Sequence, residues 1–140
     1  MGKAYYIIGT DTNCGKTIVT GAIAAWLRKE GRDVGVFKPF EAASHDSQFL
    51  KEMSGSSDPL SEINPYHFDE PLAPGVAAER AKKEVSLEKV KTLFQKLKER
   101  HEVLLVDGAG GLLVPLVGKQ THVELLQQLK VPVLLVARLG

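Results

Sequence analysis

The chain has 140 residues, 44% of them hydrophobic and 25% charged, which is enough to bury one sizeable core and predicts a single domain over residues 1–140. Its formal net charge of +1 argues against nucleic acid or an anionic membrane surface as a partner. Neither a signal peptide nor a spanning helix of roughly 20 apolar residues is expected, and a single cysteine, which cannot form an internal disulfide, fits a cytoplasmic protein.

Apolar runs typical of strands alternate with helical periods along the chain. Strands are predicted over residues 4–8, 33–37, 102–107 and 132–137. Helices are predicted over residues 16–30, 46–55, 76–83, 86–101 and 121–129. Ser86 is the expected N-cap of the fourth helix, and the last strand is expected to be buried. Near-continuous apolar strands separated by helices indicate an α/β fold with a parallel sheet covered on both faces.

A phosphate-binding loop is predicted between the first strand and the first helix. The stretch reads Gly9-Thr10-Asp11-Thr12-Asn13-Cys14-Gly15-Lys16-Thr17. Gly15 allows the backbone to turn with its N–H groups facing an anion, Lys16 reaches the outer phosphates, and the hydroxyl of Thr17 can hold Mg²⁺. The usual spacing puts four residues between the first glycine and the Gly-Lys pair, whereas Gly9 leaves five, so the loop is a variant of the pattern.

A second constellation follows the strand predicted over 102–107 and reads Asp107-Gly108-Ala109-Gly110-Gly111. Placed after a phosphate-binding loop, a strand that ends in Asp supplies an acidic Mg²⁺ ligand. An Asp in this place can also merely cap a turn. The glycines allow backbone amides to approach an anion closely, although a plain turn would use them too.

Two more polar residues follow the second predicted strand. Lys38, at its carboxyl end, can project toward the phosphates and neutralise charge during phosphoryl transfer, but an ordinary surface lysine fits as well. Asp46 is either part of this site or only the N-cap of its helix. Ligands of open parallel sheets bind beyond the carboxyl ends of the strands, so the loops after Ile8, Phe37 and Val106 are expected to converge on one site.

Other residues are interpreted as structural. Trp26 lies on the apolar side of the first helical pattern and is expected in the core. The basic residues of the 86–101 helix alternate with Leu and Phe at helical period, which is typical of a solvated face. Cys14 has no His or second Cys beside it, so nucleophilic catalysis is not expected there. The four histidines show no zinc-binding spacing.

Taken together, four motifs resemble those of dethiobiotin synthetases and cover the chain from end to end. They are the 9–17 loop with its five-residue spacing, Val36-Phe37-Lys38-Pro39-Phe40, Asn64-Pro65-Tyr66 with Glu70-Pro71-Leu72-Ala73-Pro74, and Asp107 to Gly111 with Val114-Pro115-Leu116. The resemblance implies a three-layer sandwich of the P-loop NTPase type with a mostly parallel central sheet. It also implies a homodimeric, ATP- and Mg²⁺-dependent ligase that closes the ureido ring of dethiobiotin from 7,8-diaminononanoate and CO₂.

The resemblance also implies roles for individual residues. Lys16 would act on the phosphates, and Lys38 on a substrate carbamate and the γ-phosphate. The implied metal ligands are Thr17, Asp46 and Asp107. The implied nucleotide-binding residues are Thr12, Asn13, Cys14, Gly15, Lys16, Thr17, Ile18, Asp107, Gly108, Ala109 and Gly110.

The chain departs from that family at several points. Asp107 stands where glutamate is common, which shortens the ligand by one methylene. Ala42-Ala43 stand where a Ser-Gly pair usually contacts substrate, and Ser44 is a candidate substitute. The family continues beyond the position of Gly140 with strands and helices that bind adenine and complete the dimer, so the C-terminal part of the fold is expected to be lacking.

Three alternatives stay open. A switch or metal-insertion ATPase of the same superfamily would carry a second lysine early in the loop, where Asp11 and Thr12 stand. An amidotransferase-type cofactor synthetase would not be expected to have the 64–74 segment. An inactive nucleotide-binding fragment is the third.

Overall fold

The computed structural model describes residues 2–10, 15–109 and 113–139. Fourteen elements follow one another in these residues. The strands are β1 (Lys3–Gly9), β2 (Val34–Phe37), β3 (Phe40–Ala42), β4 (Tyr66–Phe68), β5 (Val103–Asp107), β6 (Pro115–Val117), β7 (Gln120–Thr121) and β8 (Val133–Val136). The helices are α1 (Lys16–Lys29), α2 (Asp46–Ser54), α3 (Leu60–Ile63), α4 (Pro74–Ala81), α5 (Leu87–Arg100) and α6 (His122–Leu129).

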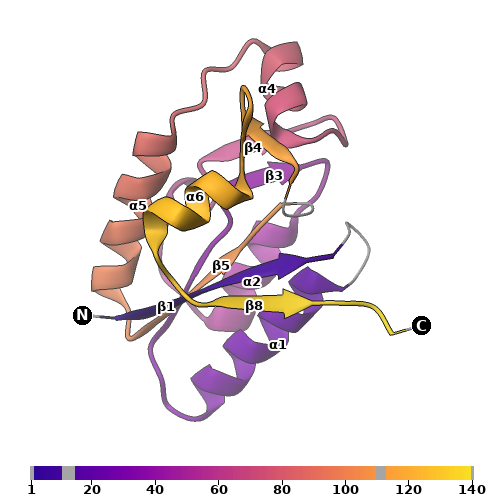
Figure 1. Cartoon of the computed structure of the whole chain (residues 1–140). Helices are drawn as coiled ribbons and strands as arrows, with labels where there is room; N and C mark the ends of the chain where they lie inside the picture. The colour runs from indigo at the N-terminus through magenta and orange to yellow at the C-terminus, as the bar shows by residue number, and fades with distance from the viewer. Residues whose placement is uncertain (1, 11–14, 110–112, 140) are drawn as a thin grey trace.

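The central sheet has the strand order β2-β5-β1-β8, and all its pairings are parallel (Figure 1). Two small sheets stand apart from it, a parallel pair of β3 with β4 and an antiparallel pair of β6 with β7. The predicted α/β fold with a mostly parallel central sheet is therefore confirmed.

Side chains of the central strands alternate between two apolar clusters, one on each face of the sheet. On β1, Tyr6 points into the cluster under α5 and α6, and Ile7 into the cluster under α1 and α2. On β5, Leu104 and Leu105 divide in the same way. Each fully buried side chain of this size stabilises the fold by about 1.5–3 kcal/mol. Helices thus cover both faces, which gives the expected three layers (Figure 1).

Helix ends follow local chemistry. The Ser86 side chain accepts a hydrogen bond from the Lys89 backbone N–H at 3.2 Å, which confirms the predicted N-cap of α5. Thr121 and Glu124 form a capping box at the start of α6 that the sequence prediction missed. The helix predicted over 76–83 begins earlier, at Pro74, because proline suits the first turn of a helix.

The prediction that Trp26 lies in the core is wrong, because its side chain is 60% exposed. The face of α1 that packs is instead a narrow stripe of small residues, including Thr20, Gly21 and Ala24. A Cβ added at Gly21 would lie 2.5 Å from the Phe49 ring, so α1 and α2 approach closely along this stripe. Trp26 lies outside it.

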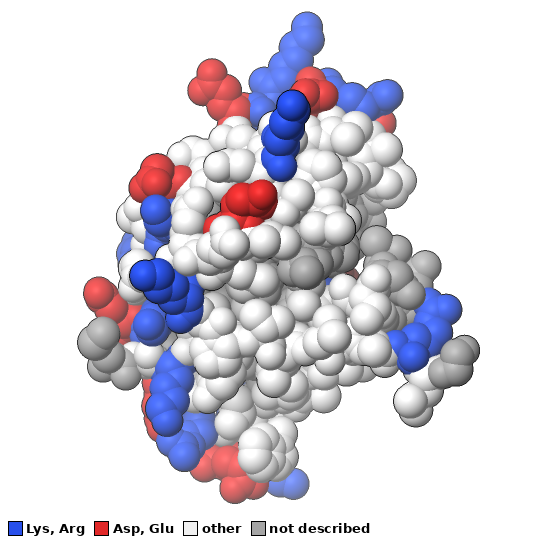
Figure 2. Space-filling view, viewed as in Figure 1, with Lys and Arg blue, Asp and Glu red and all other residues white. Residues whose placement is uncertain are grey.

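Strand β8 was predicted to be buried, and this too is wrong. It pairs with β1, but Val133, Leu134 and Leu135 are 44%, 40% and 66% exposed. Within the part of the chain that the structure describes, no strand pairs with the outer edge of β8. In Figure 2, charged side chains of both signs gather around the margin of the face that carries β8, and its centre is largely uncharged. Among the described residues no helix has the length and hydropathy required to cross a membrane.

Candidate active site

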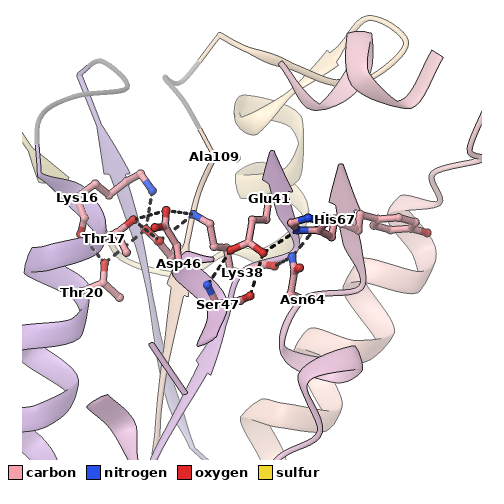
Figure 3. Close-up of polar contacts among 12 residues, drawn as sticks. Lys16, Thr17, Thr20, Lys38, Glu41, Asp46, Ser47, Asn64, His67 and Ala109 are labelled. Atoms are coloured by element: carbon pink, nitrogen blue, oxygen red, sulfur yellow. Dashed lines mark hydrogen bonds and ion pairs between the residues drawn. The ribbon is translucent and has the colours of Figure 1, made fainter. Parts of the chain in front are cut away.

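The predicted convergence of three loops is confirmed at the carboxyl edge of the sheet. Lys16 and Thr17 begin α1 after β1, Lys38 directly follows β2, and Asp107 ends β5. In Figure 3, Lys16, Thr17, Lys38 and Asp46 point toward one another from these separate elements. Parallel strands bring their carboxyl ends to one edge, so residues up to 91 positions apart meet here.

Asp107 lies at the centre of this site with its side chain fully buried. Lys16 Nζ lies 2.6 Å from Asp107 Oδ1, and Lys38 Nζ lies 3.0 Å from Asp107 Oδ2. Burial acts to raise the pKa of the Asp107 carboxyl, but the charges of the two lysines outweigh it and hold that pKa below its ordinary value. Asp107 is therefore an ionised carboxylate shared between two cations.

The two lysines differ in their surroundings. Burial lowers the pKa of Lys38, but the carboxylates of Asp107, Asp46 and Glu41 together raise it above its ordinary value; Asp46 Oδ2 lies 3.7 Å from Lys38 Nζ. Burial lowers the pKa of Lys16, and although Asp107 opposes this, the pKa stays below its ordinary value. Burial therefore dominates at Lys16, whereas the neighbouring carboxylates dominate at Lys38.

The three predicted metal ligands lie together. Thr17 Oγ1 lies 3.1 Å from Asp46 Oδ2 and 3.1 Å from Asp107 Oδ2. No group of three or more His, Cys, Asp or Glu side chains suited to a metal occurs among the described residues. The oxygen atoms that meet here belong to two carboxylates and one hydroxyl. These hard oxygen donors fit Mg²⁺, which is usually held by one or two carboxylates while phosphates and water complete its shell.

A cavity of about 700 Å³ opens beside this cluster. Its polar wall contains both lysines, and its other wall is apolar, with short side chains from the loop before α4 and from the segment after β5. The lining residues are Gly15, Lys16, Thr17, Ile18, Lys38, Glu41, Ala42, Ser44, Asp46, Pro71, Leu72, Ala73, Pro74, Ala109 and Val114. The cavity therefore joins a cationic end to an apolar end.

The predicted nucleotide-binding residues are only partly described. Gly15 adopts a left-handed conformation with φ of 84°, which glycine tolerates without strain, and Ile18 lines the cavity with 70% of the residue exposed. The predictions for Thr12, Asn13, Cys14 and Gly110 lie outside the described residues.

Gly108 and Ala109 lie behind and beside the cavity. The Gly108 N–H donates to the carbonyl of Ile7, and a Cβ at this position would meet the Tyr6 ring at 3.0 Å. Gly108 thus allows β5 to lie close to β1. Its amide is engaged within the fold, and Ala109 is the residue of this pair that lines the cavity.

His122 and Tyr6 support this loop, and the sequence prediction missed both. His122 Nε2 lies 2.7 Å from the carbonyl oxygen of Ala109, and the Tyr6 hydroxyl lies 2.7 Å from His122 Nδ1. A carbonyl only accepts, so Nε2 carries the hydrogen and Nδ1 accepts from Tyr6. Burial lowers the pKa of His122 and raises that of Tyr6, which keeps both groups neutral. The only available signal was the polar type of the two residues.

Asn64 was noted as part of a family motif, and the structure shows what it contacts. Its side-chain amide donates to the carbonyl of Lys38 at 2.7 Å and to that of Tyr66 at 3.3 Å. The Lys38 N–H in turn donates to the carbonyl of Ile63 at 2.8 Å. Asn64 therefore fixes the backbone that presents the Lys38 side chain.

Comparison with known proteins identifies a family for this chain. A family described as an AAA domain matches residues 3–140. The chain belongs to this family. Among curated proteins, this AAA-domain chain is 37% identical to ATP-dependent dethiobiotin synthetase BioD of Bacillus subtilis subsp. natto over 97% of its length and 62% of the relative. It is 42% identical to ATP-dependent dethiobiotin synthetase BioD of Anaeromyxobacter dehalogenans strain 2CP-C, over 99% of its length and 64% of the relative.

This member of the AAA-domain family thus spans 62 to 64% of the length of those two relatives. A solved structure, that of the signal recognition particle receptor FtsY from Elizabethkingia anophelis in complex with GDP, covers 93% of the chain and 34% of the receptor. Its TM-score is 0.46 at 17% identity, a likeness too low to bear on function.

Proposed function

We propose that this chain carries the nucleotide-binding and phosphoryl-transfer site of an ATP- and Mg²⁺-dependent dethiobiotin synthetase. The observation that supports it most directly is the sharing of Asp107 by Lys16 and Lys38 at one end of the cavity, beside Thr17 and Asp46. The names of the curated relatives point to the same reaction. The activity would make the protein a cyclo-ligase that forms C–N bonds.

The reaction joins 7,8-diaminononanoate, CO₂ and ATP. One amine adds to CO₂, forming an N–C bond and losing a proton, which gives a carbamate. A carbamate oxygen then attacks the γ-phosphorus, and the bond from that phosphorus to the ADP oxygen breaks. The second amine attacks the carbonyl carbon of the mixed anhydride and loses a proton, while phosphate leaves with its electron pair. The products are dethiobiotin, ADP and phosphate.

The site supplies what this chemistry requires, because carbamate and triphosphate are both anionic and repel each other. Lys16 would hold the phosphates, and Lys38 would lie between the γ-phosphate and the carbamate. Fixed cations in a buried site stabilise developing charge far better than water does. Both ammonium groups are almost fully buried, with 8% and 3% of the residue exposed for Lys16 and Lys38.

Nucleotide would be held by Thr12 and the backbone over 13–18, at the start of α1, with Asp107, Gly108, Ala109 and Gly110 along the facing loop. Thr17, Asp46 and Asp107 would hold Mg²⁺, which supplies charge neutralisation at the phosphates. Lys16, which contacts Asp107 Oδ1 at 2.6 Å, would then bind the phosphates as well.

The apolar end of the cavity fits the rest of the proposed substrate. Leu72, Ala73, Pro74 and Val114 form a wall without charged side chains beside the cationic end. An aliphatic chain that carries two amines would lie along this wall with its amines toward Lys38. Ala42 leaves the wall without the hydroxyl expected there, and Ser44, which also lines the cavity, is the proposed replacement. We further propose that the protein is a homodimer and that it acts in the cytoplasm.

The test is ADP release from ATP with diaminononanoate and bicarbonate present, compared with release when each is omitted. Release that requires both, together with dethiobiotin detected by mass spectrometry, is expected. Release without the diamine would favour a switch ATPase, and nucleotide binding without release would favour a non-catalytic nucleotide-binding domain.

A further inference from the structure

Glu41 is a buried carboxylate next to the site, and the roles discussed above do not account for it. It lies in the middle of β3, where it pairs in register with His67 of β4, and only 3% of the residue is exposed. Burying a charge is costly unless hydrogen bonds compensate it. Three donors compensate Glu41, and two of them come from the same residue, Ser47 of α2 (Figure 3).

The contacts with Ser47 fasten the first turn of α2. The Ser47 N–H donates to Glu41 Oε1 at 2.8 Å, and the Ser47 hydroxyl donates to Glu41 Oε2 at 3.0 Å. N–H groups in the first turn of a helix have no partner within the helix, and the N-cap residue His45 supplies no side-chain hydrogen bond. Glu41 replaces that cap from a neighbouring strand, with its negative charge at the positive end of the helix.

Asp46 directly precedes Ser47 and shares a peptide bond with it. Fixing the Ser47 N–H therefore fixes the backbone from which the Asp46 side chain reaches Thr17 Oγ1 at 3.1 Å. That side chain is 39% exposed, so packing alone does little to hold it. Oxygen ligands of metals commonly depend on such outer hydrogen bonds for their orientation.

His67 holds Glu41 from the other side. Its Nδ1 lies 2.9 Å from Glu41 Oε2, and an ionised carboxylate only accepts, so Nδ1 carries the hydrogen. Tyr66, the preceding residue of β4, stacks on Phe40 at 5.6 Å between ring centroids. The small β3–β4 sheet thus provides a rigid base for the Glu41 carboxylate.

We propose that Glu41 is a positioning residue for the divalent cation: through Ser47 it fixes Asp46 at the metal side of the site, and His67 fixes Glu41 in turn. This inference rests on the proposed function, since it requires Mg²⁺ beside Asp46 when nucleotide is bound. In this proposal Glu41 acts on the cation through Asp46.

The test measures the affinity of the chain for a non-hydrolysable ATP analogue by calorimetry, once with Mg²⁺ and once with EDTA. The ratio of the two affinities is the magnesium enhancement. Glu41→Ala is expected to reduce this enhancement by about tenfold, with little change of affinity in EDTA. Ser47→Ala, which removes one hydroxyl and leaves the β3–β4 sheet intact, is expected to reduce it by about two- to threefold.

Two further variants serve as the positive and the negative control. Asp46→Ala should abolish the enhancement. Glu62→Ala, the matched control, removes a carboxylate that pairs with Lys96 and Arg100 and is absent from the cavity lining, so the enhancement should be unchanged. If Glu41→Ala does not fold, as judged by circular dichroism, Ser47→Ala alone decides the matter.

The outcomes separate the two proposals. A wild-type chain without magnesium enhancement would overturn the proposed function and this inference together. Enhancement that Asp46→Ala removes while Glu41→Ala and Ser47→Ala retain it would overturn only the role of Glu41. Equal losses of affinity in Mg²⁺ and in EDTA would also overturn it, because they indicate a merely structural effect.

Discussion

Two clusters of charged and titratable side chains, each built around a buried carboxylate, lie at opposite edges of the central sheet. The site cluster, at the carboxyl edge, consists of Lys16, Lys38, Asp46 and Asp107. The amino-edge cluster, at the start of β2 and β5, consists of Asp33, Asp58, Arg100 and His101. In the amino-edge cluster His101 Nδ1 lies 2.9 Å from Asp33 Oδ1, its Nε2 lies 2.5 Å from Asp58 Oδ2, and Arg100 also pairs with Asp58.

The clusters differ in how charges are matched and in what they face. Each ring nitrogen of His101 has a carboxylate of its own, and none of the four residues lines the cavity. In the site cluster both lysines contact the same carboxylate, Asp107, while Asp46 lies farther from Lys38 at 3.7 Å, and the cluster borders a cavity of about 700 Å³. Burial of charge is therefore no mark of function by itself. Two buried cations that contact the same carboxylate beside an open cavity are the better indicator of an anion-binding site.

Removing one cation from the site cluster should have the largest effect. Lys38→Ala, and equally Lys16→Ala, is expected to lower the rate of the proposed ring closure by at least about 10²–10³-fold, because preorganised charge of this kind contributes that much. Circular dichroism should show the fold retained. Lys96→Ala, which removes an exposed lysine that pairs with Glu62, is the control. Wild-type turnover in either active-site variant would exclude these roles.

Neutralising the shared carboxylate should distinguish the clusters by their response to anions. Asp107→Asn leaves two buried lysines without their main counter-ion, and the free energy of unfolding in urea should fall by about 3–5 kcal/mol. Added pyrophosphate should restore part of the loss, since an anion in the cavity replaces the missing charge. Pyrophosphate should not rescue Asp58→Asn in the amino-edge cluster. Rescue of both variants, or of neither, would contradict the distinction.

Neutralising the amino-edge cluster should affect stability alone. Asp58→Asn removes the charge that faces Arg100 and His101, and the free energy of unfolding should fall by about 1–2 kcal/mol. The loss stays small because water screens the exposed part of Arg100. Affinity for nucleotide should be unchanged. Arg32→Ala, which breaks an exposed pair with Glu102, should leave both quantities within error. A weakened nucleotide affinity in Asp58→Asn would show that the two edges are coupled.

The smallest expected effect is a dependence of the free energy of unfolding on pH. Burial acts to raise the pKa of Asp58, but hydrogen bonds from Arg100, His101 and Ser56 outweigh it and hold that pKa below its ordinary value. The carboxylate therefore contributes stability above the unfolded pKa of about 3.9, and the contribution is lost as the pH falls through the folded pKa. The stability difference between wild type and Asp58→Asn, measured in urea, should shrink below about pH 4. A difference that persists at low pH would contradict this.

Much of the fold followed from periodicity. The four central strands and the longer helices were predicted to within about two residues, because both faces of the sheet require continuous apolar runs. The meeting of Lys38 with Asp107 followed from topology, since parallel strands end at one edge. Strands such as β3 and β4, with three residues each, carry too short a pattern to be recognised, and their pairing brings together Phe40 and Tyr66, which are far apart in the sequence.

The supporting residues of the site were beyond prediction for a related reason. His122 reaches Tyr6 across 116 positions, and Glu41 reaches Ser47 around a turn whose course the sequence does not specify. Trp26 shows the opposite kind of error, a residue predicted to be buried that is exposed. The helical period placed it in the core, whereas the close approach of Gly21 to Phe49 shows that a different face of α1 packs against the protein. Contacts between single polar side chains depend on the finished fold and leave no periodic signal.

The site cluster as described is electrically neutral, with two ammonium groups facing two carboxylates. A lone Mg²⁺ would bring two positive charges to oxygens that the lysines already engage, and a lone triphosphate would bring an uncompensated negative charge. Arriving as one complex, the two ions largely cancel each other, and each weakens the lysine contacts that obstruct the other. Metal and nucleotide should therefore bind with positive cooperativity. This thermodynamic coupling follows from the charge balance between the lysines and the carboxylates and requires no conformational change.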